Sequence, residues 1–157
     1  MNVLLLTHWK NAWIPYFRAE FERRGCEFSV THSAYDAKIK WDLALHGWAT
    51  TQPVPGAKNV MFLRRYELFE GVFGRVKWSG IDRLICVNTW IADRVREAFC
   101  KQGITVPISV IYNGVDVKNW TFRTRKAGVK IGMACHVHPK KNLPLAVQIL
   151  AALPENY

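Results

Sequence analysis

The chain has 157 residues, half of them apolar, and a formal net charge of +10. This length suits one compact domain with a substantial core and is short for two complete domains. The first apolar run, residues 3–6, is shorter than the core of a signal peptide or a membrane span, so we expect a cytoplasmic protein. The four cysteines form no C-x-x-C pair, which favours a reducing compartment over a disulfide framework.

The positive charge is concentrated near the end of the chain. Residues 118–157 hold seven of the 22 basic residues, and Glu155 is the only acid among them. Such a segment favours a partner that carries phosphates, whether a nucleotide, a nucleic acid or an anionic lipid. A basic, solvated surface that binds no specific anion is the alternative.

Short apolar runs alternate with amphipathic stretches over the first 117 residues. Helical spacing of apolar residues predicts helices at residues 13–24 and 89–100, with a broken helix at residues 66–78. Gly25 and Gly103 stand where the two regular helices should end. Repeated strand, helix, strand units predict an α/β fold, a Rossmann-like parallel sheet with flanking helices. The expected strands are residues 2–6, 27–31, 41–46, 58–63, 83–87 and 107–112.

The junction after the sixth expected strand carries the most specific motif of the chain. Residues 113–116 read Asn-Gly-Val-Asp, and residues 118–128 form a basic linker. A further strand at residues 129–134, a loop and a helix at residues 143–153 follow. An Asn-Gly pair also favours a β-hairpin turn, but residues 115–125 lack the alternating apolar pattern of a returning strand.

This order resembles the junction between the two domains of GT-B glycosyltransferases, above all the retaining enzymes of family 4. The resemblance implies a Rossmann-like N-terminal domain at residues 1–117, the linker at residues 118–128, and the first strand, loop and helix of a C-terminal donor-binding domain at residues 129–157. It implies transfer of a sugar from a nucleotide-diphospho-sugar to an acceptor, with retention and without a further cofactor. The family's acidic residues that grip the donor lie deeper in the second domain, so the 157-residue chain alone is expected to be inactive.

The resemblance also assigns donor-side and cleft residues. Members of the family usually carry Gly-Arg after this strand and a Lys further on, and both cations bind the donor diphosphate. This chain has His136 in place of the Arg, keeps the second cation at Lys141, and has Asn142 where the family usually has Gly. The residues expected to line the cleft between the domains are Asn88, Asn113, Gly114 and Asp116.

Residues that follow the other strands are the acceptor-side candidates, because ligands of parallel sheets bind beyond the carboxyl ends of the strands. His46 ends a strand that resembles the acceptor-side strand of the family and is the catalytic candidate; a structural His that caps a strand end is the alternative. Trp13 and Trp90 lie on apolar faces of the expected helices, which predicts that they belong to the core. The acceptor-side candidates are His8, Trp9, Trp48, Arg64, Arg65, Tyr66 and Glu67.

The sequence leaves two other interpretations open, a zinc site and a different function. Cys135, His136 and His138 suggest zinc, although no further ligand can be named and GT-B enzymes generally need no metal for their chemistry. A basic binding module for nucleic acid or an acidic polymer is the second function, although no RNP, helix-turn-helix or OB pattern is present. No G-x-G-x-x-G follows the first strand, which argues against a dinucleotide oxidoreductase.

The expected partners follow from the resemblance and from the last segment. They are a nucleotide sugar and a carbohydrate or lipid-linked acceptor, with peripheral contact at the inner face of a membrane and no specific nucleic acid. Residues 129–157 would leave an unpaired strand edge and an apolar helical stripe in water. We therefore expect a homodimer through residues 129–157, with docking of this segment on the first domain as the alternative. The stripe consists of Leu145, Ile149, Leu150 and Leu153.

Overall fold

The computed structural model divides into two compact units, Met1–Val115 and Asp116–Tyr157. This division lies close to the limit expected between the first domain and the linker. Each unit is described by itself. The structure describes residues 1–7, 13–32, 35–49, 51–69, 71–114, 117–119, 121, 123–124, 128, 131–135 and 139–154.

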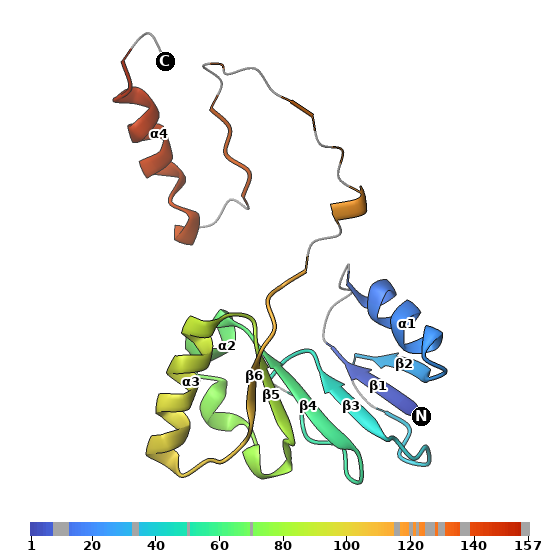
Figure 1. Cartoon of the computed structure of the whole chain (residues 1–157). Coiled ribbons are helices and arrows are strands. Elements are labelled where there is room, and N and C mark those ends of the chain that lie inside the picture. Colours follow the sequence, from blue (N-terminus) through green and yellow to red (C-terminus); the bar gives the residue numbers. More distant parts are fainter. Residues whose placement is uncertain are drawn as a thin grey trace. The chain divides into compact units, whose positions relative to one another are not determined.

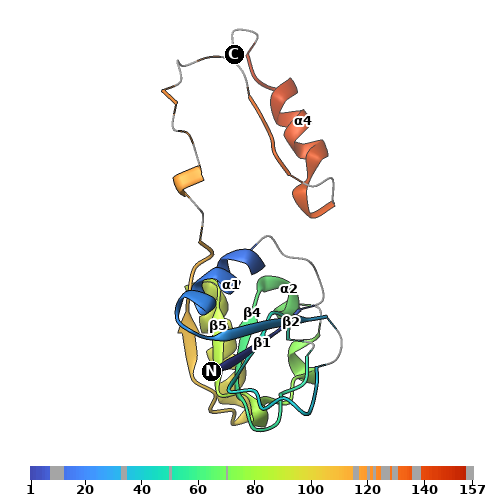
Figure 2. The ribbon, with the colours of Figure 1, turned by 90° about the vertical axis from the view of Figure 1, so that its right-hand side faces the viewer.

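The first unit is built on one sheet of six parallel strands in the order β2-β1-β3-β4-β5-β6 (Figure 1). Every strand pairing is parallel, which confirms the predicted α/β, Rossmann-like fold. Figure 2 shows the twist of the sheet, since β1 and β2 run across the view while β4 and β5 stand nearly upright. The strands are β1 Asn2–Leu6, β2 Glu27–Thr31, β3 Leu43–His46, β4 Lys58–Leu63, β5 Arg83–Cys86 and β6 Ile108–Val110.

Helices cover both faces of this sheet, and the alternation of side chains along β4 shows how. Phe62 packs on the face that α1, Ile14–Arg23, covers with Phe17 and other aromatic side chains. Met61 and Leu63 point to the opposite face, where α3, Thr89–Gln102, buries its apolar side. The predicted broken helix is the short helix α2, Arg65–Phe69, followed by 3-10 turns at Phe73–Arg75 and Trp78–Gly80.

The ends of α3 follow sequence signals, with one shift. The helix was expected to start with Thr89, a good N-cap residue, but the N-cap is Asn88, because its side chain accepts a hydrogen bond of 2.8 Å from the backbone N–H of Ile91. Gly103 ends the helix at φ 65°, in the left-handed region that Gly tolerates best. The predicted core position of Trp90 is wrong. Its side chain is 47% exposed and stacks on Phe69, because it lies in the first turn of α3, away from the sheet.

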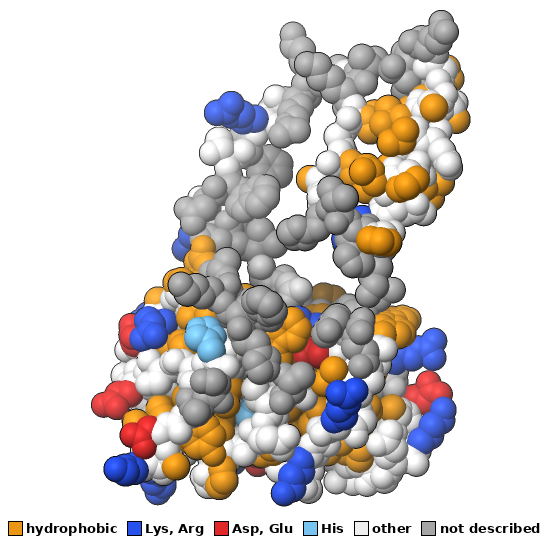
Figure 3. Space-filling model, turned by 180° about the vertical axis from the view of Figure 1, so that it is seen from behind, with side chains coloured by type: hydrophobic (Ala, Val, Ile, Leu, Met, Phe, Trp, Pro, Cys, Tyr) orange, Lys and Arg blue, Asp and Glu red, His pale blue; other side chains and the backbone are white. Residues whose placement is uncertain are grey.

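The second unit contains α4, Leu143–Ala151, after 3-10 turns at Val117–Asn119 and Pro139–Lys141. The helix agrees with the sequence pattern. The strand expected at residues 129–134 is not formed in its described part, residues 131–134. No described strand of the second unit lies beside it to accept its hydrogen bonds. Apolar side chains lie along α4 (Figure 3), and the more exposed ones are Leu143, Leu145, Val147, Ile149 and Leu150.

Among the described residues, every helix is too short or too polar to cross a membrane. The homodimer expected through residues 129–157 stays a prediction.

The contact between Gly80 and Pro53 gives a test of packing in the first unit. A Cβ added at Gly80 would lie 2.6 Å from Cγ and 2.7 Å from Cβ of the rigid Pro53 ring, whereas one added at Gly74 meets nothing within 4 Å. We expect Gly80→Ala to lower the free energy of unfolding by about 1–3 kcal/mol, and Gly74→Ala to leave it unchanged or slightly raised. Urea unfolding of both variants checks this. Equal stabilities would show that the Pro53 loop moves away freely.

Candidate functional site

The carboxyl ends of β4, β5 and β6 surround a cavity of about 540 Å³ on the face of the sheet that α1 covers. One wall consists of Trp13, which is the N-cap of α1, and Phe17, which lies in α1. Phe62 of β4 and Arg64, directly after β4, form another wall. Among the described residues, its lining is aromatic and apolar apart from Arg64 and Asn113. The remaining lining residues are Val87, Ile111, Tyr112 and Gly114. Ligands of parallel sheets bind at this edge, so this cavity is the candidate site.

Arg64 lies between two indole rings at this edge. Its guanidinium carbon is 5.9 Å from the ring centroid of Trp13 and 5.0 Å from that of Trp48. Both distances are within the range of a cation–π contact. Arg64 directly follows β4 and precedes α2, so its backbone is held by the sheet on one side and by the helix start on the other.

The buried carboxylate of Glu67 holds the loops around Arg64. One oxygen accepts a hydrogen bond of 2.7 Å from the backbone N–H of Arg64, and the other accepts one of 2.7 Å from the backbone N–H of Ala49. The first bond is the return bond of a capping box at the start of α2. Burial raises the pKa of Glu67, and the two hydrogen bonds and the charge of Arg64 partly oppose that rise. Both carboxylate oxygens are thus engaged in joining the end of β3 to the end of β4.

His46 is fully buried, and both of its ring nitrogens have partners. Nε2 lies 2.8 Å from Oδ1 of Asn59, and Nδ1 lies 2.6 Å from the hydroxyl of Thr51. Oδ1 of Asn59 also accepts from the backbone N–H of Val54, so it must be the oxygen, and Nε2 of His46 must carry the proton. Burial lowers the pKa of His46. The imidazole therefore ties the Thr51 loop to β4, and its catalytic role stays a prediction.

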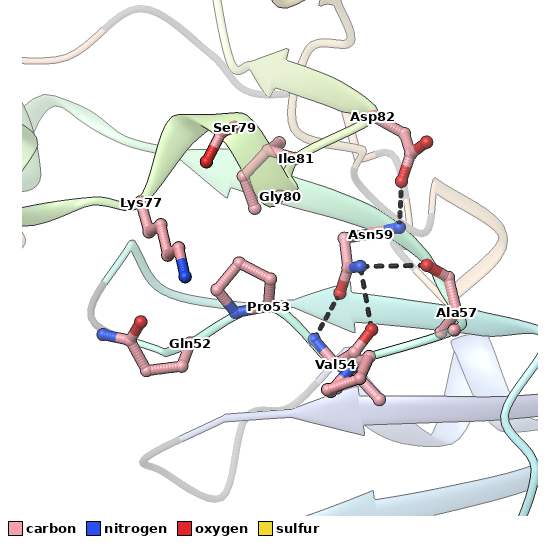
Figure 4. A pocket seen from close by; sticks show the side chains of 12 residues that line it. Gln52, Pro53, Val54, Ala57, Asn59, Lys77, Ser79, Gly80, Ile81 and Asp82 are labelled. Carbon is pink, nitrogen blue, oxygen red and sulfur yellow. Dashed lines mark hydrogen bonds between the residues drawn. The ribbon is translucent and has the colours of Figure 1, made fainter.

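A second cavity, of about 680 Å³, lies at the opposite, amino-terminal edge of β4 and β5. Figure 4 shows Asn59 at its base, bonded through its side chain to Val54 and Ala57 and through its backbone N–H to Asp82. Every side-chain polar atom of Asn59 is used in this way or by His46. This cavity is larger and is also lined by Gln52, Lys77, Ser79 and Asp82, but it lies at the amino-terminal edge. Ligands of parallel sheets bind at the carboxyl ends of the strands, so we prefer the cavity there.

The structure brings together only part of the predicted site. Arg64, Trp48, Asn113 and Gly114 lie at or next to the carboxyl-edge cavity. Glu67 does not line it but accepts a hydrogen bond from the backbone N–H of Arg64, and Asn88 caps α3. Lys141 is exposed in the second unit. His8, Trp9, Asp116 and His136 lie outside the described residues, as do the side chains of Arg65 and Tyr66.

Sequence reasoning missed the aromatic wall of the cavity. Trp13 was expected in the core because it lies on the apolar face of its helix. Both Trp13 and Phe17 pack against the core, but they also line the cavity. Val87, Ile111 and Tyr112 lay inside the strands expected at residues 83–87 and 107–112, so the search for residues that follow a strand passed over them. The structure ends these strands earlier, at Cys86 and Val110, which places the three residues at the cavity.

No metal site is seen in the part of the chain that the structure describes. No three His, Cys, Asp or Glu side chains gather there within reach of one ion. Cys135 is exposed, and the two histidines of the zinc alternative, His136 and His138, lie outside the described residues.

The buried His46 predicts a pH effect. Because its pKa is lowered in the folded state, its stabilising contribution is present above about pH 6.5 and is lost as the pH falls below that value. We expect NMR titration of the ring to show a neutral Nε2–H tautomer and a midpoint below that of a free imidazole. A midpoint at or above the free value would contradict the hydrogen-bond network described for His46.

The two hydrogen bonds of the buried Glu67 predict that replacing one of its carboxylate oxygens lowers the stability of the fold. Glu67→Gln replaces one acceptor by an amide N–H₂, which cannot accept from Ala49 or Arg64, so we expect unfolding to cost about 1–3 kcal/mol less. Glu97→Gln is the matched control, since Glu97 is exposed, and should change stability little. Thermal unfolding of both variants decides. A Glu67→Gln protein as stable as the control variant would show that the carboxylate does not hold the loops.

Comparison with known proteins does not assign the chain to a family. No protein-family model, no curated protein and no solved structure matches the chain. Its function must therefore be argued from its own residues.

Proposed function

We propose that the first unit is the acceptor-side half of a GT-B glycosyltransferase and that the second unit opens its donor-side half. The observation that carries the proposal is the aromatic cavity with Arg64 at the carboxyl edge of the sheet. Its rim includes Ile111, Tyr112, Asn113 and Gly114, the last residues of the first unit before the chain leaves it. The Asn-Gly-Val-Asp motif of the resemblance thus begins at this rim.

The cavity suits an acceptor that carries rings. Aromatic faces such as those of Trp13 and Phe62 pack well against the C–H faces of a sugar or against another apolar body. Asn113 adds a polar group at the rim, and Arg64 adds a planar set of N–H donors. In this proposal His46 and Glu67 are positioning residues, since their polar atoms bind protein groups.

The donor side of the proposal rests on the second unit. Lys141 ends the 3-10 turn that directly precedes α4, and its side chain is exposed. Asn142 caps α4 at φ 49°, in the left-handed region that favours Gly, which is the residue usual at this place in the family. Lys141, with His136, would bind the donor diphosphate and stabilise the negative charge that develops on it as the sugar leaves. Retention and the absence of a further cofactor are part of the proposal.

The proposed location is the cytoplasm, with the acceptor reached at the inner face of a membrane where it is lipid-linked. The state of the cysteines supports this location, because all four are free thiols. A reducing compartment maintains this state.

The alternative, a basic module for nucleic acid, finds no support on the helices of the first unit. The described cations of α1 and α3 are paired with carboxylates of the same helix, so these two helices form no continuous positive surface. The pairs on α1 join Arg18 to Glu22 and both Arg23 and Arg24 to Glu20, and those on α3 join Arg94 and Lys101 to Glu97 and Arg96 to Asp93.

The proposal is tested with the protein expressed from its natural gene, together with whatever sequence follows residue 157. Given a panel of uridine and guanosine diphospho-sugars, it should release nucleoside diphosphate and transfer sugar. Lys141→Ala should lower kcat/KM by about 100-fold, as for loss of one group that stabilises transition-state charge. Lys101→Ala, an exposed cation paired with Glu97, is the control and should leave kcat/KM unchanged.

Two outcomes would contradict the proposal. One is a natural protein that neither binds nor turns over any of these donors. The other is turnover that Lys141→Ala and Lys101→Ala reduce equally.

A further inference from the structure

We infer that the carboxyl-edge cavity takes an acceptor with one anionic group, a phosphate or a carboxylate, joined to an apolar or ring-shaped body, and that Arg64 binds the anion. That this ligand is the acceptor of a sugar rests on the proposed function. The binding of an amphipathic anion rests on the cavity alone.

The charge of the cavity is the first reason. Among its described lining residues, Arg64 is the only ionised side chain, and none is an acid. Arg64 makes no ion pair with any carboxylate of the described residues, whereas the arginines of α1 and α3 are paired. The carboxylate of Glu67 binds the backbone N–H of Arg64, and the guanidinium charge acts on it only as a nearby charge. A guanidinium that forms no ion pair among the described residues of an apolar cavity is costly, and an anionic ligand would offset that cost.

The geometry of Arg64 is the second reason. The guanidinium lies near the rings of Trp13 and Trp48, and cation–π contacts use none of its N–H donors. No hydrogen bond engages the guanidinium among the residues that the structure describes, so its donors can bind a phosphate or carboxylate through two parallel N–H groups. Because two indoles and the Glu67 hydrogen bond already hold the residue, little freedom is lost when a ligand binds.

The apolar part of the cavity wall indicates what the ligand carries besides its anionic group. Phe17, Phe62, Val87 and Ile111 give the cavity an apolar side, and its volume of about 540 Å³ is within the range of small-molecule sites. A bare inorganic ion would leave this side in contact with water. A donor diphosphate would bring more negative charge than one guanidinium balances. The match is an organic anion with a single charged group.

The test uses the 157-residue chain and titration calorimetry with four probes: phenyl phosphate, octyl phosphate, inorganic phosphate and neutral benzyl alcohol. Phenyl or octyl phosphate should bind at least about tenfold more tightly than the other two, and less tightly as salt increases. Preference for phenyl phosphate would indicate a ring-bearing acceptor phosphate, and preference for octyl phosphate a lipid phosphate.

Three variants assign the effect to Arg64. Arg64→Gln should weaken binding at least about tenfold, and Arg64→Lys should weaken it less, because the charge remains while the planar donor set is lost. Arg83→Gln is the matched control, since Arg83 is exposed at the amino end of β5, and should bind as the parent does. Should Arg64→Gln fail to fold, Arg64→Lys and the salt titration still decide.

The inference is overturned if benzyl alcohol or inorganic phosphate binds as tightly as the organic phosphates, or if Arg64 and Arg83 variants behave alike. None of these probes is a nucleotide sugar, so the two proposals fail separately. An Arg64-dependent anion site in a protein without transferase activity would refute only the proposed function. Transferase activity with no Arg64-dependent anion binding would refute only this inference.

Discussion

The arrangement of the site depends on one buried carboxylate. In a parallel sheet the loops after neighbouring strands begin with backbone N–H groups that no strand pairs. Glu67 accepts from two of these, at Ala49 and Arg64, and so ties the loop after β3 to the start of α2. Since Trp48 precedes Ala49, the same bonds bring this indole and Arg64 together. The desolvation that raises the pKa of Glu67 is offset because both oxygens find donors.

A second cluster of buried polar side chains lies near the start of β4 and holds the loop before it. Asn59 lies near the start of this strand, and its amide binds the backbone of Val54 and Ala57 and the ring of His46. His46 in turn reaches Thr51, so the loop between β3 and β4 is fastened at several points. Gly47 continues this tight packing, because its backbone N–H bonds to Leu6 and a Cβ there would lie 3.1 Å from the Leu6 carbonyl oxygen. Side-chain hydrogen bonds thus hold β4 near its start, at Asn59, and directly after its end, at Arg64.

The cavity itself follows from how α1 meets the sheet. Side chains alternate along β4, so Phe62 faces α1 while Met61 and Leu63 enter the core beneath α3. Trp13 and Phe17 pack near Phe62 but leave the ends of β5 and β6 open, and Ile111 and Tyr112 stay more than half exposed at the rim. An apolar hollow next to a single cation is the result. Amphipathic anions match this combination.

Local pattern in the sequence was enough to determine most elements. Residues 2–6, 27–31 and 58–63 read as strands and are strands with the same limits, and Gly103 ends α3 as expected. Apolar periodicity is a property of one segment, so it can be read without knowledge of its neighbours. The parallel α/β class followed because the segments alternate in kind.

Only the tertiary structure decided which polar residues are buried and which aromatic residues line a cavity. His46 and Asn59 are 13 residues apart, and Glu67 binds a backbone group 18 residues away, so no local pattern reports these partners. The same holds for Trp90, whose helix presents it to solvent. Residues 131–134 look like a strand by composition, but a strand needs a neighbour to accept its hydrogen bonds, and pairing is a property of two segments rather than one.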